Sequence, residues 1–99
     1  MKVTPSEKIL IQKILGKSLD RTNHTVFAFG SRVSGTPRPD SDLDLMLRAQ
    51  TKTGAATLGQ LKEDFENSDL PYKVDLVDEA VMSEDFRRKI AKDLEPVTF

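Results

Sequence analysis

Apolar residues along the chain recur with two periods, one typical of helices and one typical of strands. The first helical stretch begins at residues 4–7, where Thr4, Pro5 and Glu7 match a capping box with proline at the first helical position. This start predicts a helix that runs to about Leu19. The apolar stripe that would pack on the rest of the domain is Leu10, Ile11, Ile14 and Leu15.

Three other segments have the alternation or the β-branched and aromatic residues of strands. They predict strands at residues 25–29, 43–47 and 73–77. Gly30 ends the first strand. One glycine and two prolines between residues 31 and 41 predict a loop there, with room for one short helical turn at its start.

Two further helical patterns follow the second and the third predicted strand. One runs from residue 58 toward residue 67, and the other begins at a cap in residues 83–85 and stops before Pro96. Their apolar stripes are Leu58, Leu61 and Phe65 in the first and Phe86, Ile90 and Leu94 in the second.

The order helix, strand, strand, helix, strand, helix predicts a fold of the α/β (α+β) class, a small mixed β-sheet with helices packed on it. No linker divides the chain, so residues 1–99 are expected to form a single domain. Val97 and Phe99 lie past Pro96, where they could pack on this core or on another subunit.

Composition narrows the chemistry that the domain can perform. The formal net charge is −1, so no overall field attracts a nucleic-acid backbone, and nucleic acid is a disfavoured partner. With no cysteine and a single histidine, His24, any metal must be bound by oxygen. The apolar run near the N-terminus is far too short to span a bilayer, and we expect a cytoplasmic protein without a membrane partner.

Three carboxylates interrupt the strand patterns in a way that suggests a site. Asp42 and Asp44 are two positions apart, so they project from the same face of the strand while Leu43 and Leu45 enter the core. Asp75 stands between two apolar residues of the third predicted strand. If the two strands are neighbours, the three acids converge, and a hard cation such as Mg²⁺ would relieve their repulsion. Two ions about 3.5–4 Å apart could activate an attacking oxygen and stabilise a leaving one.

The turn after the first strand supplies a second half of this site. Gly30 lets the backbone approach a ligand closely, and the amides that follow, with the Ser31 hydroxyl, can hold a phosphate. Arg32 could pair with phosphate oxygens, or it could lie on the surface. Gly30 and Gly35 have the spacing of a P-loop, but Thr36 stands where that loop needs lysine.

A purely structural role for the three acids is an alternative to a metal site. Asp42 and Asp44 could protect an exposed edge strand from aggregation, and Asp75 could be a solvated or salt-bridged strand residue. Asp78 is a rival for the role of Asp75, but its place after the strand is typical of a residue that starts a helix.

The motifs together resemble the nucleotidyltransferase superfamily typified by DNA polymerase beta. The resemblance rests on Phe29-Gly30-Ser31, on Asp42-Leu43-Asp44-Leu45 and on Val74-Asp75-Leu76, which agree with that family in residue type, spacing and strand placement. The short chain and the run from Phe29 to Leu47 look most like the minimal nucleotidyltransferases that are encoded beside helical HEPN proteins.

The resemblance implies a specific activity. Asp42 and Asp44 would hold Mg²⁺, Asp75 would complete the metal site and help to activate an acceptor hydroxyl, and Gly30 and Ser31 would contact the triphosphate, with Arg32 as a further candidate. A nucleoside monophosphate, AMP from ATP in the minimal members, would be joined to a tyrosine of a HEPN toxin partner in a hetero-oligomer. The chain would then act as an antitoxin.

A second class of function stays open beside catalysis. The chain could be a non-catalytic nucleotide-binding or antitoxin subunit that neutralises its partner by occupying the partner's surface. The sequence does not identify the base of the nucleotide or the acceptor.

Overall fold

The protein, described over all of residues 1–99 by a computed structural model, is built on one four-stranded sheet. Its strands follow the spatial order β3-β2-β1-β4. β1 is antiparallel to both β2 and β4, while β2 and β3 are parallel, so the sheet is mixed as predicted. The elements are α1 (Pro5–Ser18), β1 (His24–Phe29), α2 (Ser31–Ser34), β2 (Leu43–Ala49), α3 (Ala55–Glu66), β3 (Val74–Asp78), the 3₁₀ turn η1 (Glu79–Val81), α4 (Glu84–Ile90), the 3₁₀ turn η2 (Ala91–Asp93) and β4 (Glu95–Val97).

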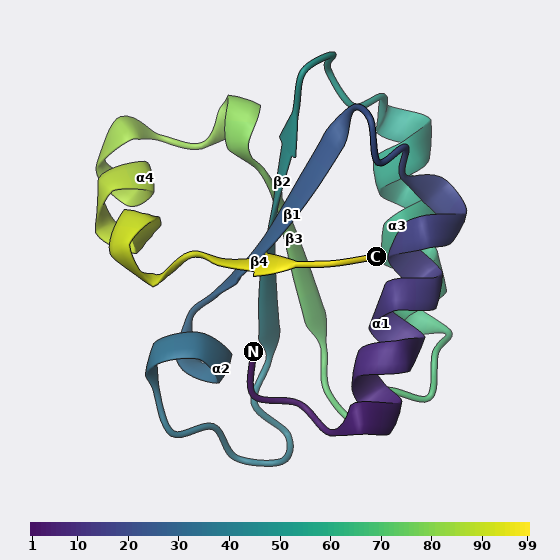
Figure 1. Ribbon diagram of the computed structural model, residues 1–99, viewed down its shortest axis with the longest axis vertical. Helices are drawn as coiled ribbons and strands as arrows, with labels where there is room; N and C mark the ends of the chain where they lie inside the picture. The colour runs from purple at the N-terminus through teal and green to yellow at the C-terminus, as the bar shows by residue number, and fades with distance from the viewer.

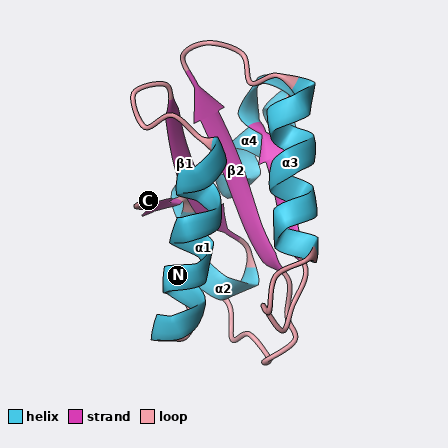
Figure 2. Cartoon of the chain, turned by 90° about the vertical axis from the view of Figure 1, so that its right-hand side faces the viewer, coloured by secondary structure: helices cyan, strands magenta, loops and turns pink.

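Helices cover the two faces of this sheet unequally. The two long helices, α1 and α3, lie side by side on one face, and α4 and the short α2 lie on the other (Figure 1). In the view turned by 90°, α1 and α3 stand in front of the strands (Figure 2). None of the helices combines the length and the apolar character needed to cross a bilayer.

The alternation along the strands explains why there are two apolar layers. Leu43, Leu45 and Leu47 are fully buried in the larger layer, against α1 and α3. The smaller layer, between the sheet and α4, consists of Phe29, Met46, Met82 and Ile90. Residues at alternate positions of β1 and β2 therefore contribute to opposite sides, and both sides are packed.

The predicted caps are present and fix where the helices start. The Thr4 hydroxyl accepts from the amide of Glu7, whose carboxylate accepts in turn from the amide of Thr4, which confirms the capping box of α1. At the start of α4 the Ser83 hydroxyl accepts from the amide of Phe86, so this predicted cap is confirmed as well.

The end of the chain differs from the sequence-based expectation. The last α-helix ends at Ile90 instead of continuing to Leu94, and residues Glu95–Val97 form β4, an edge strand that pairs with β1. Pro96 does not simply terminate a helix. It lies opposite Phe27 on an edge, where a residue without an amide proton is tolerated. Val97 is buried in the larger apolar layer, which answers the question of where this residue packs.

Candidate active site

The three sequence motifs meet on three adjacent strands. Phe29, the last residue of β1, pairs with Asp44 of β2, and Asp44 in turn pairs with Asp75 of β3. Gly30 and Ser31 follow directly at the end of β1. The strand register therefore brings the turn and two of the predicted carboxylates side by side, although they are far apart in sequence.

Asp44 lies on the same face of the sheet as the smaller apolar layer. Its neighbours in the strand, Leu43 and Leu45, are fully buried on the opposite face. Phe29, directly across from Asp44, belongs to the smaller layer, and residues paired across a sheet share a face. The carboxylate is thus held at the rim of an apolar layer by a strand whose other face is anchored in the core.

Gly30 is required by the close approach of the turn to this carboxylate. Its φ of 80° and ψ of −155° lie in a region that is open essentially to glycine alone. A Cβ at this position would collide with Oδ2 of Asp44. Gly30 also caps α2, so the exposed Ser31 begins a helical turn right beside the acid.

The electrostatics of Asp44 mark it as the centre of the acidic group. Partial burial raises the pKa of the Asp44 carboxyl, and the nearby carboxylates of Asp75 and Asp42 raise it further. Folding therefore makes the ionised form of Asp44 less favourable. A cation bound beside Asp44 would offset both the burial of this charge and its repulsion by Asp75 and Asp42.

The other two acids are more accessible. Asp42 is exposed and stands immediately before β2. The side chain of Asp75 is 41% exposed, and its Oδ1 lies 3.4 Å from Nζ of Lys73. In this arrangement no group of three or more His, Cys, Asp or Glu side chains is placed to hold a metal ion. Asp44 and Asp75, as paired neighbours, are the nearest to a shared oxygen site.

Arg32 is placed differently from a phosphate ligand. Its side chain is buried, and its guanidinium carbon lies 3.8 Å from the centre of the Tyr72 ring. All three of its nitrogens donate to backbone carbonyl oxygens, at 2.8–3.3 Å, and these belong to Lys2, Arg38, Pro39 and Ser41. With its donors engaged in this way, Arg32 holds the 35–42 loop against the N-terminal segment, and we leave it out of the phosphate site.

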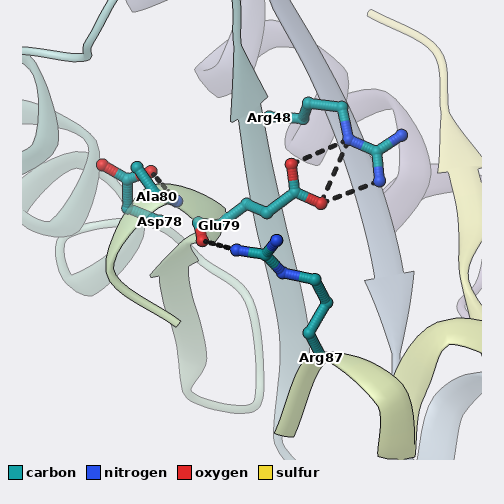
Figure 3. Close-up of polar contacts among 5 residues, drawn as sticks. All are labelled: Arg48, Asp78, Glu79, Ala80 and Arg87. Atoms are coloured by element: carbon teal, nitrogen blue, oxygen red, sulfur yellow. Dashed lines mark hydrogen bonds and ion pairs between the residues drawn. The ribbon is translucent and has the colours of Figure 1, made fainter. Parts of the chain in front are cut away.

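One polar cluster on this face was not identified from the sequence. Nε and Nη2 of Arg48 donate to the carboxylate of Glu79 at 2.8–3.1 Å, and the Arg48 guanidinium lies 4.7 Å from the centre of the Phe27 ring. Nη2 of Arg87 donates to the carbonyl oxygen of Glu79 at 3.1 Å (Figure 3). The hydrogen bonds from Arg48 lower the pKa of Glu79. This cluster ties α4 to the end of β3.

The basic run Arg87-Arg88-Lys89 falls on the last predicted helix, and the sequence alone predicts that it lies on the exposed face of that helix. For Arg87 this was wrong, because the residue is half-buried and turned toward Glu79. Helical periodicity alone does not separate Arg87 from its exposed neighbours Arg88 and Lys89. A signal that could have separated them is Glu79 itself, an acid directly after the strand that carries Asp75.

Asp78 and His24, to which the sequence analysis gave no role in the site, also lie outside it in the structure. Asp78 is the last residue of β3, and its carboxylate accepts from the amide of Ala80, which confirms that it starts the following helical turn. His24 lies at the opposite end of β1, where Nε2 is 2.8 Å from the Thr53 hydroxyl.

A groove on the α3 face of the sheet borders one of the three acids, Asp75. It has a volume of about 450 Å³ and runs between β3 and the end of α3. Phe65 and Tyr72 lie in its wall, and Asp75 and Lys73 stand on the β3 side. Of the Gly30 turn and the three acids, only Asp75 borders this groove.

A mixed sheet that brings a Gly-Ser turn against an Asp-apolar-Asp strand, with a further acid on the parallel neighbour, is the arrangement of a nucleotidyltransferase domain. Residues 10–97 match the family model "Polymerase beta, Nucleotidyltransferase". The chain belongs to this family.

Similar proteins agree with this assignment. The chain is 45% identical over 87 residues to "Probable protein adenylyltransferase MntA" of Haemophilus influenzae, with 88% of this chain and 75% of that protein covered. Its fold is similar to that of a toxin-antitoxin crystallised with AMP-PNP, at 23% identity and a TM-score of 0.71, over 95% of this chain and 73% of the other. It is also similar to a chain in the complex of a tri-AMPylated Shewanella oneidensis HEPN toxin with an MNT antitoxin, at 19% identity and a TM-score of 0.56, over 91% and 71%.

Proposed function

We propose that this chain is an adenylyltransferase that transfers AMP from ATP to a tyrosine hydroxyl of a HEPN toxin and so acts as its antitoxin. The observation that carries the proposal is the strand register, in which Phe29 pairs with Asp44 and Asp44 with Asp75. This register unites an anion-binding turn with a pair of carboxylates. The relatives named above support the choice of nucleotide and of acceptor.

Asp42, Asp44 and Asp75 are the residues that would hold Mg²⁺. The fit rests on the chemistry of the donors, because Mg²⁺ prefers carboxylate oxygens, and on the raised pKa of Asp44 between two other acids. When bound, one or two Mg²⁺ ions would neutralise charge on the phosphates and on the carboxylates. Because Asp42 and Asp75 are accessible, their side chains can turn toward Asp44 when a cation is present.

The residues of this chain then have separate tasks. The turn at Gly30 and Ser31 holds the triphosphate through its amides and its hydroxyl. The Asp75 carboxylate accepts the proton of the acceptor hydroxyl, whose oxygen forms a bond to the α-phosphorus. The bond from the α-phosphorus to the oxygen that bridges to the β-phosphate breaks, and pyrophosphate leaves with those electrons. Asp75, which is 41% exposed on the edge strand β3, is open to an acceptor segment that approaches from solvent.

The test uses the chain, its HEPN partner, Mg²⁺ and ATP labelled at the α-phosphate. We expect label on the partner with the unmodified chain, and a rate at least about 100-fold lower with Asp44→Asn, which removes an electrostatic stabiliser of the transition state. Asp40→Asn, an exposed acid of the neighbouring loop, is the matched control and should keep full activity.

The same assay separates catalysis from simple neutralisation. If the partner is bound but receives no label from the unmodified chain, the transferase proposal is wrong. If the toxin stays neutralised after Asp42, Asp44 and Asp75 are all replaced by asparagine, the chain acts as a binding antitoxin instead.

A further inference from the structure

Helix α4 presents an aromatic ring to solvent on the same face of the sheet as the acids. Phe86 is 37% exposed, although its helix packs on the smaller apolar layer through Ile90. The other large exposed apolar side chains are Val81 on η1 and Ile9 on α1, and α1 lies on the opposite face of the sheet (Figure 1).

A short series of contacts joins this ring to the site. The rings of Phe86 and Phe29 meet edge to face, with their centres 5.9 Å apart and their planes at 78°. Phe29 pairs with Asp44 and is followed by Gly30, whose backbone abuts the Asp44 carboxylate. A single side chain therefore separates the exposed ring from the place where the phosphates are expected to lie.

The ring is held in position by a well-anchored helix. The amide of Phe86 donates to the Ser83 cap, and Ile90, one turn further on, is buried in the smaller apolar layer. Arg87 donates to the carbonyl oxygen of Glu79, which Arg48 secures from β2 (Figure 3). The strands that carry Asp44 and Asp75 thus fix the helix that carries Phe86.

We propose that Phe86 is the platform on which the nucleobase of the bound nucleoside triphosphate stacks. The inference rests on the proposed function and adds the position of the base to it. An exposed aromatic face beside a phosphate site binds a base because every base has a π-face, and stacking of this kind needs no hydrogen-bond partners. Selectivity should then follow stacking strength, so purine nucleotides bind more tightly than pyrimidine nucleotides.

The test compares two replacements that both keep an apolar contact with Phe29. Phe86→Leu removes the π-face, and we expect it to weaken ATP binding about 5- to 100-fold. Phe86→Trp keeps the π-face and should bind ATP as tightly as the unmodified chain or more tightly. Because the chain has no tryptophan, ATP should also quench the fluorescence of the indole that this replacement introduces.

Inorganic tripolyphosphate separates stacking from a merely structural role. It lacks a base, so its affinity should be the same for the unmodified chain and for Phe86→Leu, and it should leave the indole fluorescence unchanged. The preference for ATP over CTP should shrink in Phe86→Leu. Ile9→Ala, an exposed apolar residue of the opposite face, should change none of these values.

Three outcomes would overturn the inference. Unchanged ATP affinity in Phe86→Leu would mean that the base lies elsewhere, and an equal loss of ATP and tripolyphosphate binding would mean that Phe86 only supports the fold. Weaker association with the HEPN partner at unchanged ATP affinity would make Phe86 a protein contact. All of these are binding measurements, so they stand apart from a failure of AMP transfer, which would count against the proposed function.

Discussion

Gly30 carries the strictest local requirement in the molecule. Its backbone angles are accessible essentially to glycine, and the space for a Cβ is taken by the Asp44 carboxylate. A small side chain at this position would disturb both the turn and the acid, so stability and the site depend on the same residue.

We therefore expect Gly30→Ala to lower the free energy of unfolding by about 1–3 kcal/mol, because the new side chain is strained and collides with Asp44. Urea denaturation measures this change. Gly59, in the middle of α3 with open space around it, is the matched control, and Gly59→Ala should raise the free energy of unfolding by about 0.5–1 kcal/mol. If the two replacements changed the free energy of unfolding in the same way, Gly30 would not lie as close to the Asp44 carboxylate as described.

Asp44 gives a prediction for pH. Its folded-state pKa is raised above the ordinary value of 3.8, so between these two values the native state binds more protons than the unfolded state. The free energy of unfolding contributed by Asp44 should fall as pH rises through this window. In denaturation series without divalent cations, Asp44→Asn should lose this downward slope while Asp40→Asn keeps it. Parallel profiles for the unmodified chain and Asp44→Asn would contradict the charge repulsion.

At the scale of single residues, the sequence predicted that acids of two strands lie together, as Asp44 and Asp75 do, but not how the side chains are engaged. The i, i+2 spacing of Asp42 and Asp44 does not reveal that Asp42 is exposed before the strand begins. Arg32 beside the turn was open to either role. Its four backbone acceptors come from the N-terminus and from the loop, and no local pattern records such contacts.

Among the elements, the 35–42 loop between α2 and β2 depends on Arg32. The buried guanidinium donates to three carbonyl oxygens in the second half of this loop and to the carbonyl oxygen of Lys2 in the N-terminal segment. The loop leads directly into Asp42 and Asp44. Arg32 therefore orders the backbone that leads to these acids.

Arg32→Leu should lower the free energy of unfolding by at least about 2 kcal/mol, because four partly buried carbonyl oxygens lose a charged donor. Thermal or urea denaturation measures the loss. The exposed neighbour Arg38 is the control, and Arg38→Leu should change the free energy of unfolding by no more than about 0.5 kcal/mol. If Arg32→Leu were as stable as the unmodified chain but failed to bind tripolyphosphate, Arg32 would be a phosphate ligand after all.

Long elements were predicted well, and short ones were not. The helices and the three longer strands were predicted because each repeats its period several times. β4 has three residues and contains a proline, so it has no period to read, and its existence depends on β1 offering a free edge. The α4 boundary was wrong for the same reason, since Ile90 and Leu94 are four residues apart whether or not the helix continues.

For the whole molecule, the two ends of the chain close the fold. Met1 and Glu95 form an ion pair through the N-terminal ammonium group, and Val97 of the edge strand β4 lies opposite Val26 within the larger apolar layer. The sequence left open whether Val97 served this core or another subunit. In the structure this side chain belongs to the core of its own chain.

Val97→Ala should accordingly lower the free energy of unfolding by about 1–3 kcal/mol, the cost of removing two buried methyl groups and leaving a cavity. Val81, which is 77% exposed on η1, is the matched control, and Val81→Ala should change the free energy of unfolding by less than about 0.5 kcal/mol. Equal, small effects would mean that β4 contributes little to the fold.

The proposed function depends most on one prediction, that the strands carrying Asp44 and Asp75 are neighbours in the sheet. The sequence required β2 and β3 to be neighbours if Asp44 and Asp75 were to act together, and the parallel pairing confirms that they are. No pattern within either strand specifies this pairing or its register. The resemblance to a known family implied only that the three acids share one site.

The proposed function requires a divalent cation to bind between Asp42, Asp44 and Asp75, beside the Gly30 turn. The most direct measurement replaces Mg²⁺ with paramagnetic Mn²⁺ in the presence of a non-hydrolysable ATP analogue and records the broadening of backbone amide signals. We expect strong broadening at Gly30, Asp44 and Asp75 and little at His24 and Ala49, which pair at the far end of β1 and β2. Broadening centred at that far end, or none at Asp44, would contradict it.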